Sequence, residues 1–399
     1  MSRLWYFNPE NDLALAAGRP SYTPPDAAVR LRRAGKVLPA WMAAPGDMVL
    51  CCGVNAAWWR GCRDRLGLEL RPWDGRADIV PEPWGWSEYT RAVLRRAGVS
   101  AAALPSDGFL AGLRDLSHRR TAALLRDAVA ARINFPIWPG ATEIRSVAEA
   151  AAYVAAHPGG CVLKLPWSSS GRGIAFVGPG VQLPAHLSGD IRRYGSVMAE
   201  PAARKTADFA MLYDVRSDGV VFRGVSVFDT DTHGAYTANA VAPQEHLLDR
   251  LSRLYPRERL DAVRDAVAEA LSVICAGRYE GPAGVDMLVA ESDGGGPVLH
   301  AAVEINFRYT MGFVALGVAR YTAVPAVMAV ERGDTTATCV YDTVDSRFAG
   351  GRLALTPPGC DFTFVLMSPF NCGGAYNSSL GQALGQKHLR SIRGDNHWI

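Results

Sequence analysis

The sequence predicts a mixed α/β (α+β) protein in which a small unit with a parallel sheet precedes a longer region with antiparallel sheets. Two observations support this prediction. Over the first 112 residues, short apolar segments alternate with helical patterns, which is typical of a layered parallel sheet. Between Cys161 and Asp231, five short apolar segments follow one another with only glycine or polar turns between them, which is typical of antiparallel strands.

The first unit begins with an apolar strand. Leu4–Phe7 and Met48–Cys52 are strand candidates, and helices are predicted over 55–66 and 86–97. Proline and glycine recur over 71–85, which indicates loops there. Because parallel strands need crossover connections, usually helices, this order predicts a Rossmann-like α/β domain.

Helical patterns precede and follow the antiparallel region. A helix is predicted over 113–131, and another begins at Ser146, where Glu149 three residues later completes a capping box. A third helix is predicted over 258–277, because its apolar residues recur at three- and four-residue spacing on one face. A fourth is expected over 312–330.

Composition and charge exclude several classes of protein. Of the 399 residues, 49% are hydrophobic and 20% are charged, which is ordinary for a globular chain and unlike a disordered or fibrous one. The net charge of +3 gives no electrostatic basis for binding nucleic acid. No apolar run reaches the roughly 18 residues of a membrane span, and the first residues lack the pattern of a signal peptide. The eight cysteines form no C-x-x-C pair, so we expect reduced core residues in a cytoplasmic protein.

The segment CVLKLPWSSSGRGI, residues 161–174, has the residue types of a phosphate site. A strand carries Lys164, and small or polar residues follow it, namely Ser168, Ser169, Ser170, Gly171, Arg172 and Gly173. Small residues let backbone N–H groups approach phosphate oxygens, and the lysine adds a point charge. The lysine precedes the glycines, so this is not a Walker A loop, and no dinucleotide fingerprint is present. Taken alone, a simple hairpin turn beside a surface lysine explains the segment equally well.

The hairpin VDMLVAESDGGGPVLHAAVEIN carries a candidate metal site. Glu304 and Asn306 are two residues apart on a strand, so their side chains share a face. Reflecting the hairpin about Gly295 places Asp286 opposite Glu304, and cross-strand partners also share a face. Carboxylate and amide oxygens suit Mg²⁺, especially where phosphates complete its coordination. Arg308 has the same parity on the strand. A solvated sheet face is the alternative.

The segment SVMAEPAARKTADF contains a candidate nucleoside site. Met198, Ala199 and Glu200 end a short strand before Pro201, and an extended backbone there offers N–H and C=O groups to an adenine edge. Asp208, eight residues after Glu200, is a candidate acceptor for ribose hydroxyls. For this segment alone, an ordinary strand end is the favoured interpretation.

Together the three segments resemble the ATP-grasp superfamily over roughly 113–335. VEINFRYTMG resembles the family's E-x-N-x-R metal strand, and SHRRTAALLRDAVAARINFPIWPG resembles the helix and turn that open its nucleotide half. The resemblance implies an N-terminal α/β (pre-ATP-grasp) domain over 1–112 and a two-lobed ATP-grasp fold after it. The nucleotide-binding lobe with the glycine-rich loop is expected over 113–230. The C-terminal lobe, with the metal site and an extension, is expected over 231–399.

The resemblance also implies roles for individual residues. Lys164 would hold nucleotide phosphates, and residues 168–173 would cover them as a loop. Arg120 is our candidate for the family's earlier phosphate-binding lysine, which has no clean match among His118, Arg119 and Arg120. The adenine hinge and the ribose site would be formed by Met198, Ala199, Glu200 and Asp208. Mg²⁺, normally two ions, or Mn²⁺ would be bound by Asp286, Glu304 and Asn306. Arg308, together with Lys164, would act on the transferred phosphoryl group.

The activity implied by the resemblance is that of an ADP-forming carboxylate–amine ligase. It would use ATP to make an acylphosphate from a small-molecule or peptide carboxylate and then form an amide bond with an amine. A small-molecule kinase and a non-catalytic nucleotide-binding protein are the alternatives. No nucleic-acid or membrane partner is expected, and the resemblance leans toward a homodimer.

Other conspicuous segments have no assigned role in this scheme. Four polar residues follow the first strand, and helix capping is favoured over ligand contact for them: Asn8, Glu10, Asn11 and Asp12. For the tryptophans at 58, 59, 73, 84 and 86, packing is favoured over stacking on a substrate. For His233, beside Asp229 and Asp231, an ordinary polar loop is favoured over proton shuttling. The loop NCGGAYNSSLG either closes over a substrate or is an ordinary loop, and no base lies beside Cys372 in the sequence.

Overall fold

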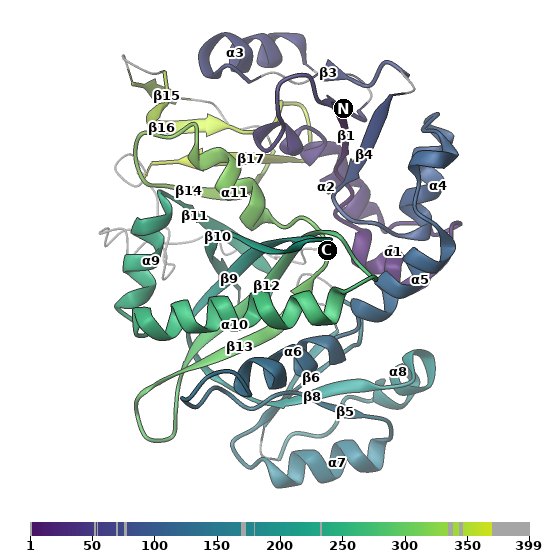
Figure 1. Cartoon of the computed structure of the whole chain (residues 1–399), viewed down its shortest axis with the longest axis vertical. Coiled ribbons are helices and arrows are strands. Elements are labelled where there is room, and N and C mark those ends of the chain that lie inside the picture. Colours follow the sequence, from purple (N-terminus) through teal and green to yellow (C-terminus); the bar gives the residue numbers. More distant parts are fainter. Residues whose placement is uncertain are drawn as a thin grey trace.

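The computed structural model describes residues 2–368 apart from 52, 54, 69–70, 76–77, 169–172, 179, 232–233, 334–337 and 343–345. In that part of the chain the strands form three sheets, one of nine strands and two of four. Figure 1 shows the N-terminal sheet at the upper right, the nine-stranded sheet in the middle and the second small sheet below it. The first sheet is parallel and the other two are antiparallel, so the predicted mixed α/β class is confirmed.

The N-terminal sheet has the strand order β3-β2-β1-β4, the order that also begins a Rossmann sheet. Its elements are β1 (Ser2–Tyr6), α1 (Asn11–Ala17), α2 (Asp26–Gly35), a 3₁₀ turn (Leu38–Trp41), β2 (Met48–Val49), α3 (Ala56–Leu66), β3 (Arg71–Pro72), β4 (Ile79–Pro83), α4 (Glu88–Arg96) and a second 3₁₀ turn (Ala101–Ala103). The buried core holds Leu4, Met48, Ile79 and Leu94. Helices α3 and α4 lie where the sequence predicts them, but strands β3 and β4 form within 71–85, where the proline and glycine pattern indicates loops.

The second four-stranded sheet has the order β5-β8-β6-β7 and is antiparallel throughout. Its elements are β5 (Thr142–Ile144), α7 (Val147–Ala156), β6 (Cys161–Lys164), β7 (Ile174–Val177), α8 (Leu187–Tyr194) and β8 (Val197–Pro201). Helix α7 begins at the predicted cap, where the Glu149 N–H donates to Ser146 Oγ over 3.1 Å. Leu163 and Ala199 pack beneath α7 and α8, so alternate residues of β6 and β8 face the opposite way.

The nine-stranded sheet has the order β13-β12-β9-β10-β11-β14-β17-β16-β15. Its strands are β9 (Arg204–Arg216), β10 (Gly219–Thr230), β11 (Tyr236–Val241), β12 (Gly281–Glu291), β13 (Pro297–Asn306), β14 (Ala326–Arg332), β15 (Thr338–Tyr341), β16 (Phe348–Ala354) and β17 (Phe362–Met367). Four helices complete the described fold together with α5 (Asp107–Leu116): α6 (Arg120–Ala130), α9 (Gln244–Ser252), α10 (Arg257–Cys275) and α11 (Met311–Ala319).

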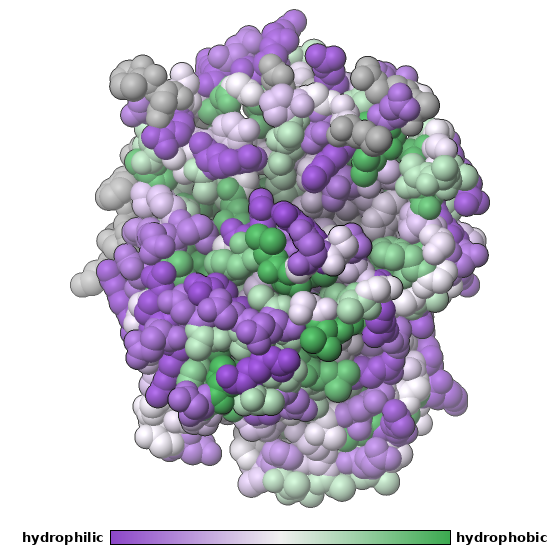
Figure 2. Space-filling model, in the orientation of Figure 1, coloured by the Kyte–Doolittle hydropathy of each residue, from purple (hydrophilic) through white to green (hydrophobic). Residues whose placement is uncertain are grey.

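Helices α6, α9 and α10 cover one face of the nine-stranded sheet. Phe209 and Met211 of β9 lie in one buried cluster with Val263 and Val267 of α10, and α6 lies beside α10 (Figure 1). Figure 2 shows hydrophilic residues gathered over α9 and the start of α10. Because adjacent strand residues alternate between faces, Asp208 and Ala210 of β9 face the other side, where the cavity described below lies.

Two predicted helices differ from the structure. The helix expected over 113–131 is divided between α5 and α6, and the break falls at 117–119. The helix expected over 312–330 ends at Ala319, and Ala326–Arg332 form strand β14. Pro325 has no N–H to continue a helix, and the residues after it pair with both β11 and β17. None of the helices in the described part of the chain has the length and apolarity needed to cross a bilayer.

Candidate active site

A cavity of about 660 Å³ is lined by residues of the two antiparallel sheets and of the N-terminal unit. Ligand pockets usually have roughly 300–1,000 Å³, so this cavity has the size of a small-molecule site. The small sheet contributes Lys164 and Glu200, the nine-stranded sheet contributes Asp286 and Glu304, and the N-terminal unit contributes Trp84. Three of the predicted segments therefore meet at one place.

The wall formed by the small sheet combines a cation with apolar side chains. Val162 and Lys164 of β6, and Ile174 and Phe176 of β7, line the cavity, whereas the intervening Leu163 is buried under α7. Phe176 is 62% exposed, which is unusual for a phenylalanine and places its ring at the edge of the cavity. This surface has the apolar character that would cover one face of a nucleotide base.

Lys164 is held in the wall by a buried ion pair with Glu200. The Nζ–Oε1 distance is 2.5 Å, and Glu200 Oε2 also lies 3.4 Å from His300 Nε2. Burial alone would raise the pKa of Glu200, but the charge of Lys164 and the His300 hydrogen bond outweigh it and lower that pKa to about 2. The carboxylate is therefore ionised at neutral pH and fixes the direction of the lysine.

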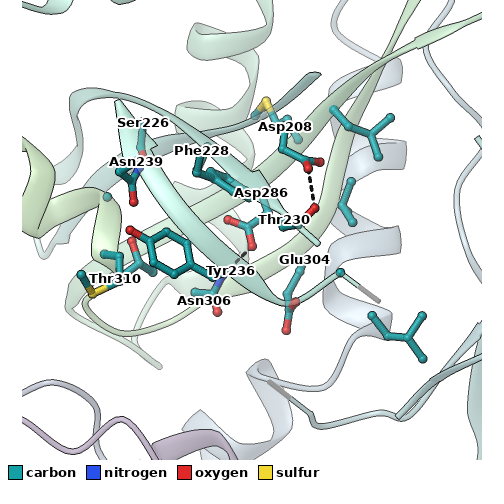
Figure 3. Close-up of a pocket in the computed structure, with 18 of the residues that line it drawn as sticks. Asp208, Ser226, Phe228, Thr230, Tyr236, Asn239, Asp286, Glu304, Asn306 and Thr310 are labelled. Carbon is teal, nitrogen blue, oxygen red and sulfur yellow. Dashed lines mark hydrogen bonds between the residues drawn. The ribbon is translucent and has the colours of Figure 1, made fainter. Parts of the chain in front are cut away.

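The opposite wall carries the predicted acidic pair. Asp286 of β12 pairs with Glu304 of β13 in the expected register, and Asn306 Nδ2 donates to Asp286 Oδ2 over 3.0 Å. Figure 3 shows Asp286 and Glu304 on adjacent strands, with the Asn306 amide directed at Asp286. Burial and then the charge of Glu304 raise the pKa of Asp286 to about 7. The charge of Glu304 thus disfavours the ionised form of Asp286.

The register at this pair depends on a bulge. Near the turn, Glu291 pairs with Pro297 and Leu288 with His300, which centres the hairpin on Gly294 rather than Gly295. From the Leu288–His300 pair to the Asp286–Glu304 pair, the step is two residues along β12 but four residues along β13. The irregularity keeps the same face of β13 toward the cavity and moves Glu304 into place opposite Asp286.

These oxygen ligands fit a divalent cation. Among the described residues, no group of three or more His, Cys, Asp and Glu side chains is suited to a metal. The predicted set has only two carboxylates, and its third member is an amide. The raised pKa of Asp286 is the relevant observation, since a cation between Asp286 and Glu304 would relieve their repulsion. Mg²⁺ usually takes only one or two carboxylates and completes its shell with phosphates and water.

Arg119, rather than the predicted Arg120, lines the cavity. Arg120 pairs with Asp115 at the surface, and 40% of its side chain is exposed. Arg119 is buried: its Nη1 lies 3.0 Å from Glu304 Oε2, and its Nη2 donates to Ser168 Oγ over 3.0 Å. The expectation for Arg120 is corrected, because its place in the first turn of α6 directs it outward, whereas Arg119 lies just before that helix.

Two of the three residues predicted for the adenine hinge also do not reach the cavity. Met198 and Ala199 are in the middle of β8, where their backbones pair with β5 on one side and β6 on the other. Their N–H and C=O groups are therefore engaged in the sheet. Glu200 does line the cavity, and so does Ala203 beyond the end of the strand.

Asp208 lies on the cavity face of β9, as the ribose role requires. Its Oδ2 accepts a hydrogen bond from Thr230 Oγ1 over 2.8 Å and lies 2.5 Å from Lys205 Nζ (Figure 3). Leu288 of β12 pairs with Asp208 and lines the same cavity. Leu288 therefore faces the cavity beside the carboxylate, across from the apolar wall of the small sheet.

Arg308 lines the cavity, and Asp12 of the N-terminal unit accepts hydrogen bonds from it. Its Nε and Nη2 donate to the two carboxylate oxygens of Asp12 over 2.8 and 2.6 Å, and its Nη1 donates to the Tyr309 carbonyl. Helix capping, the favoured interpretation of the polar run, is wrong for α1, whose N-cap Glu10 makes no side-chain cap bond. Glu10 instead pairs with Arg32, and Asn8 Nδ2 donates to the Gly85 carbonyl over 2.9 Å.

Sequence reasoning missed the apolar lining of the cavity. Val162 shares a strand face with Lys164, and Ile174 and Phe176 alternate after the loop, so a period-two pattern did carry a signal for them. The tryptophan prediction is confirmed for Trp58 and Trp73, whose Nε1 groups donate to backbone carbonyls, but Trp84 also lines the cavity.

The predicted phosphate loop is described only at its ends. Ser168 Oγ accepts from Arg119, and the Leu165 N–H donates to the Gly173 carbonyl over 2.8 Å, which closes the base of the loop. Gly173 has a φ of +66°, and a Cβ there would lie 2.5 Å from Leu165 Cδ1, so glycine is required. Ser169, Ser170, Gly171 and Arg172 lie outside the described residues, as do His233 and 371–381.

Comparison with known proteins gives weak likenesses only. No family model and no curated protein matches the chain. Three solved structures illustrate the likeness. N5-carboxyaminoimidazole synthetase from Staphylococcus aureus in complex with ADP is 11% identical, with 83% of each chain covered and a TM-score of 0.44. Biotin carboxylase from Campylobacter jejuni in complex with β,γ-ATP is 13% identical, with 92% of this chain and 87% of that one covered and a TM-score of 0.46.

The third structure is a protein from Archaeoglobus fulgidus assigned to the ATP-grasp superfamily, which is the family that the sequence motifs resemble. It is 11% identical, with 92% of this chain and 99% of that chain covered and a TM-score of 0.44. At such identities and TM-scores the likeness carries no functional argument, so the function has to be inferred from the site itself.

Proposed function

We propose that this chain is an ATP- and Mg²⁺-dependent ligase that activates a carboxylate as an acylphosphate and joins it to an amine, with release of ADP and phosphate. One observation carries the proposal. A fixed lysine on one sheet and a mutually repelling pair of carboxylates on another sheet, Lys164 and Asp286 with Glu304, line a single cavity. In this proposal 1–112 is the N-terminal domain, 113–230 the nucleotide lobe and 231–399 the metal lobe.

The lining residues fit an ATP molecule in one orientation. The adenine would lie between Ile174 and Phe176 on one side and Leu288 on the other, and Asp208 would accept hydrogen bonds from the ribose. Lys164 then lies on the phosphate side together with Arg119, which already contacts an acidic residue of the metal wall. A bound Mg²⁺ held by Asp286, Glu304 and Asn306 would neutralise charge on the phosphate oxygens.

The protein's own contribution to the reaction is positioning and electrostatic stabilisation. A carboxylate oxygen of the substrate attacks the γ-phosphorus of ATP, and the bond to the ADP oxygen breaks. The amine then attacks the acyl carbon, phosphate leaves with the electrons of the C–O bond, and the amine loses a proton. Lys164 and Arg119 are fixed before the substrate arrives, so little reorganisation is needed at the transition state.

Arg308 is suited to the acyl end of this reaction. Asp12 and Tyr309 occupy three of its five N–H groups, so within the described part of the chain two remain, one on Nη1 and one on Nη2. A guanidinium with a free N–H on each terminal nitrogen binds two oxygens of a carboxylate or a phosphoryl group. Arg308 would thus orient the carboxylate and then the acylphosphate.

The test is ATP consumption with Mg²⁺ across a mixed pool of amino acids, other small carboxylates and amines. ADP and free phosphate are assayed together, with mass spectrometry of the products. ADP, phosphate and a condensed product support a ligase, whereas ADP and a phosphorylated product without free phosphate indicate a kinase on the same site. A chain that binds no ATP in calorimetry would contradict both.

A further inference from the structure

The cavity extends beyond the residues that the nucleotide would use. Across the sheet, Leu288 pairs with Asp208, Asp208 with Phe228, and Phe228 with Asn239 of β11. Cross-strand partners share a face, so this row runs from the adenine wall to β11 over three strand spacings, about 14 Å. Phe228 and Asn239 line the cavity at the far end of the row.

The far part of the cavity has a continuous apolar wall. Phe7 and Trp84 of the N-terminal unit are in edge contact at 4.9 Å between ring centroids, and Phe7 lies 6.3 Å from Phe364 of β17. Leu31 and Val330 pack against the same cluster, and all five residues line the cavity. A ligand that fills this part must therefore present an apolar group.

One polar group in this part, the side-chain oxygen of Asn239, receives no hydrogen bond from the described residues. Asn239 is 1% exposed, and its Nδ2 donates to Ser226 Oγ over 2.6 Å and to the Val227 carbonyl over 3.3 Å. Because a carbonyl only accepts, the amide nitrogen must face Val227 and the amide oxygen must face the other way. Among the described residues, Asn239 Oδ1 receives no hydrogen bond.

The unpaired oxygen lies at the cavity close to the chain that carries Arg308. Asn239, Tyr236 and Thr310 all line the cavity (Figure 3). A Cβ on Gly312 would lie 2.7 Å from Ser226 Oγ, so the segment after Arg308 passes directly against the Ser226–Asn239 pair. Arg308 and Asn239 both line this one cavity, so a single ligand in it can contact both side chains.

We propose that the carboxylate substrate is an amino acid with an apolar or aromatic side chain. This inference rests on the proposed ligase function and names its substrate class. Arg308 would bind the carboxylate, Asn239 Oδ1 would accept a hydrogen bond from the amino group, and the apolar wall would hold the side chain. Leaving a buried acceptor unpaired is costly, so a ligand with an N–H donor is selected over an analogue without one.

The first experiment uses the unmodified protein and varies the ligand. Binding of phenylalanine and leucine is measured by calorimetry with a non-hydrolysable ATP analogue and Mg²⁺ present, beside aspartate, lysine and 3-phenylpropanoate. We expect the apolar amino acids to bind about tenfold or more tightly than 3-phenylpropanoate, which lacks only the amino group, and than the charged amino acids. Equal or tighter binding of 3-phenylpropanoate, or of aspartate or lysine, overturns the proposal, and so does the absence of any binding by the apolar amino acids.

The second experiment varies the protein. Asn239→Leu keeps the approximate volume and removes the acceptor, so we expect the Kd for phenylalanine to rise about tenfold while that for 3-phenylpropanoate stays the same. Asn239→Asp keeps an acceptor and is expected to retain the preference for the amino group. If Asn239→Leu weakens both ligands equally, Asn239 is merely structural and the proposal fails. If Asn239→Leu does not fold, the ligand comparison with the unmodified protein still decides.

The two proposals fail in different ways. Apolar amino acids that bind in this pattern without any formation of ADP would contradict the ligase function and leave the substrate class standing. Formation of ADP and phosphate only with acidic carboxylates, or only with carboxylates that lack an amino group, would support the ligase function and contradict the proposed substrate class.

Discussion

The two charged walls of the cavity shift the pKa of a buried carboxylate in opposite directions. Glu200 on the small sheet lies 2.5 Å from a lysine, and its pKa falls to about 2. Asp286 on the nine-stranded sheet is buried opposite Glu304, and burial, followed by the charge of Glu304, raises its pKa to about 7. In the first wall the cation outweighs burial, whereas in the second wall burial and the charge of Glu304 outweigh the charge of Arg308. This difference indicates which wall needs a cation from outside, and the predictions below test it.

The largest effect is expected when either wall loses its central charge. Lys164→Ala and Glu304→Ala should each lower ATP turnover by about a thousandfold or more, because each removes a charge that acts on the transferring phosphoryl group. Turnover is measured as ADP formed under saturating Mg²⁺. Arg132→Ala, at the surface beside Glu269, is the control and should retain full activity. Near-normal turnover of Glu304→Ala would remove the metal wall from the mechanism.

A stability measurement tests the wall that carries Lys164 and Glu200. The pKa of Glu200 is lowered from 4.5 to about 2 on folding, so its ionised form stabilises the folded state. That stabilisation is fully present above pH 4.5 and is lost as the pH falls toward 2. Glu200→Gln should therefore cost roughly 3 kcal/mol of unfolding free energy at pH 7 and progressively less below pH 4.5.

Urea unfolding across pH checks this prediction, with Glu269→Gln as the exposed control. A cost for Glu200→Gln that does not change between pH 7 and pH 3 would mean that the lost packing, and not the ion pair with Lys164, accounts for it.

The neighbouring arginines give a matched pair of smaller effects. Arg119→Ala should raise the KM for ATP about tenfold, because a buried guanidinium that bridges Glu304 and Ser168 would be lost. Arg120→Ala should change it by less than about twofold, because an exposed ion pair contributes little. Steady-state kinetics with varied ATP measures both, and equal effects would contradict the assignment of Arg119, rather than Arg120, to the phosphate side of the cavity.

The smallest effect is expected on the stability of the metal-free protein when the Asp286–Glu304 pair loses one charge. Asp286→Asn removes one of two facing charges and should raise the unfolding free energy by about 1 kcal/mol in EDTA at pH 8. Asp208→Asn is the matched control, because Asp208 has Lys205 beside it and should lose stability instead. If Asp286→Asn is less stable than the unmodified protein in the absence of metal, Asp286 and Glu304 do not repel each other.

The parts of the site that the sequence predicts are those carried by short local patterns. Glu304 and Asn306 share a face through simple alternation, and Lys164 precedes a loop of small residues. The pairing of Asp286 with Glu304 was predicted from a hairpin centred on Gly295, although the turn is centred one residue earlier. A bulge of two residues corrects the register, and nothing in the residue pattern signals that bulge.

Other errors have a similar origin. Arg119 and Arg120 are adjacent and chemically identical, so only the start of α6 decides which of them faces the cavity. Met198 looked available for adenine because it ends a strand, but pairing on both sides of β8 engages its backbone. The Asp12–Arg308 pair joins residues 296 positions apart, and no local pattern predicts such a contact.

The most direct test of the account is calorimetric binding of ATP with Mg²⁺ and with EDTA, to the unmodified protein and to the double variant Asp286→Asn with Glu304→Gln. The account predicts that Mg²⁺ tightens ATP binding by about tenfold or more in the unmodified protein and has no effect in the double variant, which still holds ATP through Lys164. Mg²⁺ that tightens ATP binding equally in both proteins would contradict the claim that these carboxylates form the metal wall.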